Sequence, residues 1–268
     1  MKIALTIAGS DSGAGAGVQA DLKTFAACGV YGINVVTALT AQNTQGVFGV
    51  AEVKPAFVTK QLFVLMKDIG CQAAKTGMLF SRPIIEAVAA GIRKYRIGPL
   101  VVDPVMYAKG GHPLLRPDAE QSLIALLLPL AEVVTPNIDE AVRLSGLKKI
   151  ETVDQMKEAA VKIAVLGPKH VLIKGGHLPG KPVDLLFDGT TFTTFEGERI
   201  ASDSTHGTGC TYSAAITAFL ANGRPLEQAV ARAKTFIASA IRYSYPIGHG
   251  FGPVNHFWGV KEPVKRSP

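Results

Sequence analysis

The sequence predicts an α/β fold with a mostly parallel central sheet, and two observations support this. Short apolar runs alternate with segments of helical length along most of the 268 residues. Such runs are typical of parallel strands that are buried on both faces. Near residue 183 the pattern changes to two short strands around Asp188-Gly189, a dipeptide that suits the tight turn of an antiparallel hairpin. We therefore expect a three-layer αβα architecture that includes one such hairpin.

The expected elements follow one another without a linker, a repeat or a low-complexity tract, so we expect a single domain over residues 1–268. The predicted strands are residues 3–8, 33–39, 100–105, 133–135 and 170–173, followed by the hairpin strands 183–187 and 191–195. The predicted helices are residues 55–69, 82–95, 117–127, 153–166, 211–221 and 226–244, with a further helix after the glycine-rich segment near residue 15.

Composition excludes several classes of protein. No apolar stretch reaches the roughly 18 residues that a membrane-spanning helix needs, and the N-terminal segment becomes polar too early for a signal peptide. The three cysteines, Cys28, Cys71 and Cys210, lie too far apart to indicate a disulfide framework or a zinc site. The net charge of +7 is scattered and no nucleic-acid-binding motif occurs. We expect a cytoplasmic enzyme for small anionic molecules that binds neither nucleic acid nor membranes.

Residues 204–210, with the sequence STHGTGC, are the most informative segment of the chain. Gly207, Thr208 and Gly209 form a glycine-rich turn before a predicted helix, where unpaired N–H groups and the helix dipole favour an anion. Cys210 lies in the first turn of that helix, and we expect the helix N-terminus to lower the pKa of its thiol. This arrangement is typical of phosphoryl transfer. A structural cap followed by a packing cysteine would give the same local pattern.

Four polar clusters follow predicted strands, at residues 9–21, 41–43, 103–106 and 135–140. Because the carboxyl ends of parallel strands meet at one edge of a sheet, we expect these clusters to line one cleft. Asp103 ends a buried strand, where a carboxylate is costly unless it is paired or binds a cation. Asn137 and Glu140 are spaced i and i+3, so they share one face of the next helix. The open alternatives are that Asn137 caps this helix and that Glu140 faces solvent.

One competing motif is incomplete. Residues 15–20 match the G-x-G-x-x-A fingerprint of dinucleotide-binding folds, but no Asp or Glu occurs between Asp21 and Glu52 to hold the ribose. The sequence also contains no P-loop, no H-E-x-x-H zinc-protease motif and no G-x-S-x-G hydrolase motif. These absences disfavour a dinucleotide-binding enzyme, a P-loop protein, a zinc protease and a serine hydrolase.

Motifs along nearly the whole chain resemble those of the hydroxymethylpyrimidine/phosphomethylpyrimidine kinases of the ribokinase-like superfamily. They occur in collinear order at residues 4–11, 15–25, 37–44, 75–79, 103–106, 135–137, 173–177, 205–211 and 249–256. The resemblance implies a ribokinase-like fold and transfer of phosphate from ATP, with Mg²⁺, to 4-amino-5-hydroxymethyl-2-methylpyrimidine. In the bifunctional members a second ATP converts the monophosphate to the diphosphate, and the sequence offers no marker for this second step.

The resemblance also implies roles at the acceptor side of the site. It makes Cys210 the general base toward the substrate hydroxyl, where most of the superfamily carries an aspartate. The carboxamide of Gln42 matches the donor and acceptor edge of a 4-aminopyrimidine, and bidentate pairing there would reject analogues that lack the amino group. The further expected substrate-binding residues are Asp21, Gly9, Met78 and Ala41. The N–H groups of residues 207–209 would bind the transferring phosphate.

On the nucleotide side, the resemblance implies that Lys174, Asn137 and Thr208 bind ATP. It further implies that Asp103 and Glu140 hold Mg²⁺, partly through water, because this ion keeps most of its waters and needs few protein ligands. Residues 107–112 contain a glycine pair, and we expect them to form a flap that carries Lys109 onto the phosphates.

Two alternative functions stay open at this point. A pyridoxine/pyridoxal kinase uses the same cysteine-bearing loop for another aromatic alcohol, and a non-catalytic protein that binds nucleotides or vitamers would need the same pocket. We expect a homodimer in either case.

Overall fold

The computed structural model describes residues 1–259 except 109, 177, 179 and 245. Its strands are β1 (Ile3–Asp11), β2 (Tyr31–Gln42), β3 (Val47–Glu52), β4 (Ala73–Thr76), β5 (Leu100–Val102), β6 (Val133–Val134), β7 (His170–Ile173), β8 (Val183–Phe187) and β9 (Phe192–Glu196). In the described residues they form a nine-stranded sheet in the order β3-β2-β1-β4-β5-β6-β7-β8-β9. The pairs from β2 to β7 are parallel, whereas β3 is antiparallel to β2, β8 to β7 and β9 to β8.

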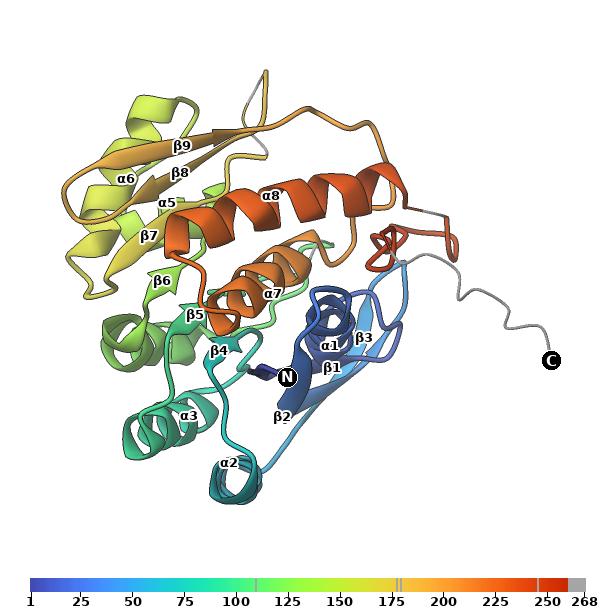
Figure 1. Ribbon diagram of the computed structural model, residues 1–268, viewed down its shortest axis with the longest axis vertical. Coiled ribbons are helices and arrows are strands. Elements are labelled where there is room, and N and C mark those ends of the chain that lie inside the picture. Colours follow the sequence, from blue (N-terminus) through green and yellow to red (C-terminus); the bar gives the residue numbers. More distant parts are fainter. Residues whose placement is uncertain (109, 177, 179, 245, 260–268) are drawn as a thin grey trace.

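Helices cover both faces of this sheet (Figure 1). One layer contains α1 (Gly17–Ala27), α7 (Thr208–Ala221) and α8 (Leu226–Arg242), which pack against one another. The other layer contains α2 (Pro55–Asp68), α3 (Arg82–Tyr95), α4 (Glu120–Ser122), α5 (Ile138–Ser145) and α6 (Val153–Ala164). The predicted three-layer αβα fold with a hairpin at residues 183–196 is therefore confirmed.

The alternation of side chains along the strands explains why both faces carry helices. On β5, Val101 packs into the cluster that contains α7 and α8, whereas Leu100 and Val102 pack into the cluster beneath α3, α5 and α6. All three are almost fully buried. Successive strand residues point to opposite faces, so a continuous apolar run fills two cores at once.

Three elements differ from the prediction. β3 and β4 were missed, and β4 gave no apolar run because its third residue is Lys75. The segment predicted as one helix over residues 117–127 instead begins as a 3₁₀ turn (Pro117–Ala119), continues through α4 and a π-helical turn (Leu123–Leu127), and ends in a second 3₁₀ turn (Leu128–Leu130). Pro129 lacks an N–H group, so it cannot continue a regular helix there.

No helix in the described part of the chain combines the length and the apolar character that crossing a bilayer requires.

Candidate active site

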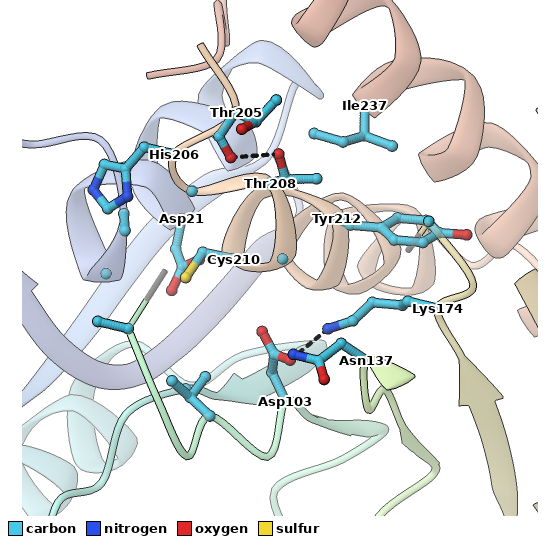
Figure 2. A pocket seen from close by; sticks show the side chains of 18 of the residues that line it. Asp21, Asp103, Asn137, Lys174, Thr205, His206, Thr208, Cys210, Tyr212 and Ile237 are labelled. Carbon is cyan, nitrogen blue, oxygen red and sulfur yellow. Dashed lines mark hydrogen bonds and ion pairs between the residues drawn. The ribbon is translucent and has the colours of Figure 1, made fainter. Parts of the chain in front are cut away.

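A cleft of about 630 Å³ lies at the carboxyl ends of the parallel strands and receives side chains from both helical layers. Figure 2 shows the N-terminus of α7 on one side of this cleft, with Asp103, Asn137 and Lys174 opposite it. Twelve of the predicted site residues line the cleft: Gly9, Asp21, Gln42, Met78, Asp103, Asn137, Glu140, Lys174, Gly207, Thr208, Gly209 and Cys210. Thus the strand ends do converge, as the alternation of strands and helices predicts.

Two predicted residues are not placed at the cleft. Ala41 is exposed, pairs with Gly49 on the neighbouring strand β3, and is not among the residues that line the cavity. Its position in β2 directs the alternate residue, Gln42, toward the cleft instead. Lys109 lies outside the described residues, so the flap over the phosphates stays a prediction.

The helix α7 begins without a side-chain cap. Gly207 is its N-cap, with a left-handed φ of 81°. A Cβ atom at Gly207 would lie 1.8 Å from the carbonyl oxygen of Gly15, so only glycine fits there. The Thr208 hydroxyl donates to the Thr205 carbonyl at 2.7 Å, which fixes the turn that precedes the helix (Figure 2). The Thr208 N–H also donates to the Thr205 carbonyl, at 3.3 Å. The N–H groups of Gly209 and Cys210, which line the cleft, have no side-chain cap.

A hydrogen bond joins this turn to the loop that follows β1. His206 Nε2 lies 2.8 Å from Asp11 Oδ2, and Asp11 also accepts the N–H groups of Gly13 and Ala16, each at 2.8 Å. Burial raises the pKa of Asp11, but His206 and these hydrogen bonds outweigh burial, so the net shift is downward. Sequence reasoning assigned no role to Asp11 or His206, although both lie within motifs that it quoted. Their pairing could not be read from the sequence, because 195 positions separate them.

Gln42 presents its carboxamide beside this hydrogen bond. The Thr40 hydroxyl donates to Gln42 Oε1 at 3.1 Å, and Gln42 Nε2 lies 3.4 Å from His206 Nε2. The carboxylate of Asp11 only accepts, so His206 Nε2 carries the hydrogen of the bond between them and cannot accept from Gln42. Within the described residues, this leaves the N–H groups of Gln42 available to a ligand.

Met78 and Gly9 meet at the apolar part of the cleft. Met78 is 8% exposed, and a Cβ atom at Gly9 would lie 2.9 Å from the Met78 sulfur. The absence of a side chain at Gly9 therefore lets the thioether approach the end of β1. A thioether in this place provides a polarisable surface for a flat ring.

Asp103 is the centre of a buried hydrogen-bonded cluster. Its carboxylate accepts from Lys174 Nζ at 3.0 Å, from the Ser213 hydroxyl at 3.1 Å and from the Thr135 hydroxyl at 3.3 Å. Burial raises the pKa of Asp103, but the Lys174 and Lys75 ammonium groups outweigh burial and lower the pKa overall. Asp103 is therefore ionised, and Lys174 reaches the cleft from the end of β7, as predicted.

Asn137 and Glu140 close the N-terminus of α5 with a capping box. Asn137 Oδ1 accepts the N–H of Glu140 at 2.9 Å, and Glu140 Oε2 accepts the N–H of Asn137 at 2.8 Å. The capping alternative for Asn137 is therefore confirmed, although the residue also lines the cleft. The solvent-facing alternative for Glu140 is wrong, because this residue is buried. Burial raises the pKa of Glu140 to about 7, with Lys174 opposing the shift.

Asp21 is buried in an ion pair that sequence reasoning missed. Its Oδ1 lies 2.7 Å from Lys75 Nζ, and its Oδ2 accepts from the Thr6 hydroxyl at 2.6 Å. Burial raises the pKa of Asp21 and the Lys75 ammonium opposes that shift. Both carboxylate oxygens already accept hydrogen bonds from the protein, so a substrate would share them.

The expected fall in the pKa of Cys210 is wrong. Burial raises the pKa of this thiol to about 11, although Lys75 and a backbone hydrogen bond from Gly17 lower it. The helix N-terminus stabilises a thiolate, but withdrawal from water costs more at this position. Cys210 is therefore a thiol at neutral pH, and it lines the cleft beside Asp21 (Figure 2). Cys28 and Cys71 are also free thiols, and burial raises their pKa values to about 12 and about 11.

A family model described as phosphomethylpyrimidine kinase matches residues 11–255 of this chain. The chain belongs to this family. It is 50% identical over 258 residues to the hydroxymethylpyrimidine/phosphomethylpyrimidine kinase of Rhizobium meliloti, covering 95% of this chain and 97% of that protein. It is 53% identical over 259 residues to the thiamine biosynthesis bifunctional protein ThiED of Geobacter sulfurreducens, where the match covers 96% of this chain but only 53% of the relative.

The fold of this chain is similar to solved structures of two types of enzyme. The phosphomethylpyrimidine kinase of Clostridium difficile is 46% identical with a TM-score of 0.81, over 90% of this chain and 100% of that chain. The pyridoxal kinase of Staphylococcus aureus in complex with ADP is 41% identical with a TM-score of 0.90, over 98% of this chain and 96% of that chain. The predicted family, its ribokinase-like fold and its activity as a hydroxymethylpyrimidine/phosphomethylpyrimidine kinase are therefore confirmed at the level of the family. The part that each residue plays stays a prediction.

Proposed function

We propose that this chain, as a single kinase domain, transfers phosphate from ATP to 4-amino-5-hydroxymethyl-2-methylpyrimidine and then to the resulting monophosphate. The observation that supports this most is the uncapped N-terminus of α7, which opens into the cleft next to Cys210. Backbone donors at such a terminus stabilise the negative charge on a transferring phosphate, which is the main task of a kinase. The relatives of similar length carry the name of both activities.

The two ends of the cleft suit the two substrates. Asn137 and Lys174 pair in an isolated β-bridge across the cleft from Thr208, and we assign these three residues to ATP. The buried carboxylates of Asp103 and Glu140 offer the oxygen ligands that Mg²⁺ prefers. In the described residues no group of three or more His, Cys, Asp or Glu side chains that could hold a metal ion is gathered. When bound, Mg²⁺ would offset the charge of the phosphates, and Glu140, whose pKa is raised to about 7, would ionise more readily.

Cys210 would accept the proton of the substrate hydroxyl during transfer. Because the thiol has a pKa of about 11, only a small fraction is ionised at neutral pH. The first phosphorylation should therefore speed up as the pH rises. The monophosphate already carries a charged oxygen, so the second phosphorylation should depend less on Cys210. Lys109, if the predicted flap closes, would serve this second step by binding the monophosphate.

A second candidate function is pyridoxal phosphorylation, because the fold is also similar to pyridoxal kinases at 41–44% identity. The deciding experiment compares turnover with Mg-ATP on the aminopyrimidine alcohol, on its purified monophosphate and on pyridoxal. We expect diphosphate from the monophosphate and the highest kcat/KM on the aminopyrimidine. Turnover restricted to pyridoxal would contradict the substrate assignment, absence of diphosphate would make the enzyme monofunctional, and binding without turnover would indicate a non-catalytic protein.

Gln42 provides the matched test of substrate recognition. Gln42→Leu removes the amide while keeping the size of the side chain, so the amino group and ring nitrogen of the substrate lose their partner. The loss should be about 1–3 kcal/mol, or roughly 5- to 150-fold in kcat/KM. The KM for ATP should stay nearly constant. An equal loss of kcat/KM for the aminopyrimidine and for ATP would indicate that Gln42 has a structural role.

We also propose that the enzyme is a cytoplasmic homodimer that binds no nucleic acid. Apolar side chains are exposed along the sheet edge and the adjoining helix, with Leu39 at 52%, Phe48 at 70% and Phe57 at 55%. Exposed apolar side chains of this size can contribute to an interface. Light scattering should give twice the chain mass, and Phe48→Glu should give monomers. A monomeric wild type would contradict the dimer.

A further inference from the structure

A buried ion pair lies directly under the first turn of α7. Lys75 and Asp21 are both 0% exposed, and Lys75 Nζ lies 2.7 Å from Asp21 Oδ1. Two apolar side chains of similar size would be at least as stable in such a place, because removal of both charges from water costs about as much as their attraction returns. A role in the reaction explains the pair better than a role in folding.

The pair contacts the residue that we propose as the base. Lys75 Nζ also donates to the Cys210 carbonyl at 3.4 Å, so the ammonium lies beneath the first turn of α7. The other charged groups that act on Cys210 are Asp21 from α1, Asp103 after β5 and Lys174 after β7. Lys174 is held by Asp103 at 3.0 Å. Lys75 is likewise held by Asp21, but it contacts the Cys210 backbone and is the cation with the largest effect on the thiol, so it is the cation best placed to stabilise a thiolate.

We propose that Lys75 is a positioning residue for the proton transfer and that the Lys75–Asp21 pair sets how readily Cys210 ionises. The proposal rests on the proposed role of Cys210. As the substrate oxygen forms its bond to the γ-phosphorus and the bond to the ADP oxygen breaks, the hydroxyl proton moves to the Cys210 sulfur. Lys75 keeps its own protons throughout. Its positive charge favours the thiolate that must exist before this step, and Asp21 holds that charge in place while offsetting part of it.

Lys75 and Asp21 have opposite effects on the ionisation of Cys210, and this makes the proposal testable. After burial, Lys75 has the largest effect on the pKa of Cys210 and lowers it, whereas Asp21 and Asp103 raise it. Burial lowers the pKa of Lys75 itself, but Asp21, Cys210 and Asp103 outweigh burial and raise it. Lys75 is therefore charged across the working range. Loss of Lys75 and loss of Asp21 should shift the ionisation of Cys210 in opposite directions.

The experiment measures alkylation of Cys210 by iodoacetamide between pH 7.5 and 10 in the full chain without ligands. Alkylation requires the thiolate, so its rate at fixed pH reports the ionised fraction. Peptide-resolved mass spectrometry gives separate rates for Cys28 and Cys71, which serve as internal controls. Lys75→Met should slow alkylation of Cys210 by about tenfold or more, and Asp21→Asn should accelerate it by about tenfold or more. Lys75→Arg keeps the charge and should restore most of the rate.

The matched control is Lys234→Met. This substitution removes the ammonium of another short ion pair that lines the cleft, with Asp184 at 2.6 Å, and that is not among the main influences on Cys210. It should leave alkylation of Cys210 unchanged.

Opposite shifts in Lys75→Met and Asp21→Asn support the proposal, and shifts in one direction or no shifts overturn it. If Lys75→Met does not fold, Asp21→Asn decides when Cys28 and Cys71 keep their wild-type alkylation rates, because a loosened fold would expose all three thiols, whereas an electrostatic role accelerates Cys210 alone. If wild type forms product and Cys210→Ala does not, the proposed function stands whatever the alkylation shows. The two failures are therefore distinguishable.

Discussion

Among the helices that begin at the edge of the cleft, α5 and α7 have N-termini that are built differently. The first turn of α5 is closed by its own side chains, because Asn137 and Glu140 each accept the other's N–H group. The first turn of α7 follows Gly207 and has no side-chain cap. An uncapped terminus keeps its N–H groups and its dipole for a ligand, whereas a capping box uses them internally. Of these two termini, α7 therefore suits the phosphate, and α5 supplies a buried carboxylate instead.

The largest effect on activity should follow from a substitution that displaces the uncapped N-terminus of α7. Gly207→Ala places a methyl group 1.8 Å from the Gly15 carbonyl oxygen at a left-handed φ, so the turn must move. We expect kcat to fall by more than about 10³-fold, because donors and base are displaced together. Stability should also fall, by at least about 1–3 kcal/mol. Gly209→Ala is the control for stability, because its nearest neighbour would lie 3.5 Å away. Equal stability of both variants would contradict the steric argument.

The next effect tests the side chain that the open terminus carries. Cys210→Ala should bind ATP normally and lower kcat for the first phosphorylation by about 10²–10⁴-fold, as expected for loss of a general base. Cys210→Asp should recover part of this rate. For the wild type, kcat/KM should rise with pH toward the thiol pKa of about 11, and in Cys210→Asp this rise should disappear. An alanine variant with near-normal kcat would exclude Cys210 as the base.

At the capped N-terminus of α5, Glu140→Gln distinguishes the capping role of this side chain from the role of its negative charge. Glutamine completes a capping box as well as glutamate does, so the helix should persist. Loss of the carboxylate should raise the Mg²⁺ concentration for half-maximal activity by about 10- to 100-fold. An unchanged Mg²⁺ dependence would remove Glu140 from the cation site.

The same variant has a pH signature in stability. The pKa of Glu140 is raised to about 7 in the folded state, above its value of 4.5 in the unfolded chain. The unfolded chain therefore releases this proton first, and the folded state loses relative stability as the pH rises from 4.5 to 7. Glu140→Gln removes that loss, so its free energy of unfolding should improve relative to wild type across this interval. Urea titrations at pH 5 and pH 8 measure the difference, and a constant difference would contradict the raised pKa.

The smallest effect should come from the cap itself. Asn137→Ala removes one acceptor from the first turn of α5 and should lower the free energy of unfolding by about 1 kcal/mol. Asn137→Ser keeps a capping oxygen and should stay within a few tenths of wild type. Equal melting of the alanine and serine variants would show that the capping box adds nothing to stability.

The sequence predicted the regular helices better than the short strands and the irregular helix. The regular helices were found to within a few residues, because an apolar stripe on a helix repeats at a period visible in the sequence. The short strand β4 was missed because Lys75 interrupts its apolar run. The strand β3 was missed because its residues are partly exposed and form no apolar run. The broken helix near Pro129 was missed because a proline close to a helix end does not reveal where the regular hydrogen bonding stops.

The sequence by itself determined the layers of the fold, the family and most of the predicted residues that meet at the cleft, since these follow from periodicity and from motifs at strand ends. It did not exclude Ala41 from the cleft or identify Asp11, Lys75 and His206 as part of it. Only the tertiary structure decided the charge states. It pairs Asp11 with His206, Asp21 with Lys75 and Asp103 with Lys174, residues far apart in the chain. It also reverses the expected shift in the pKa of Cys210. A pKa depends on burial and on neighbouring charges in space, and neither is fixed before the chain folds.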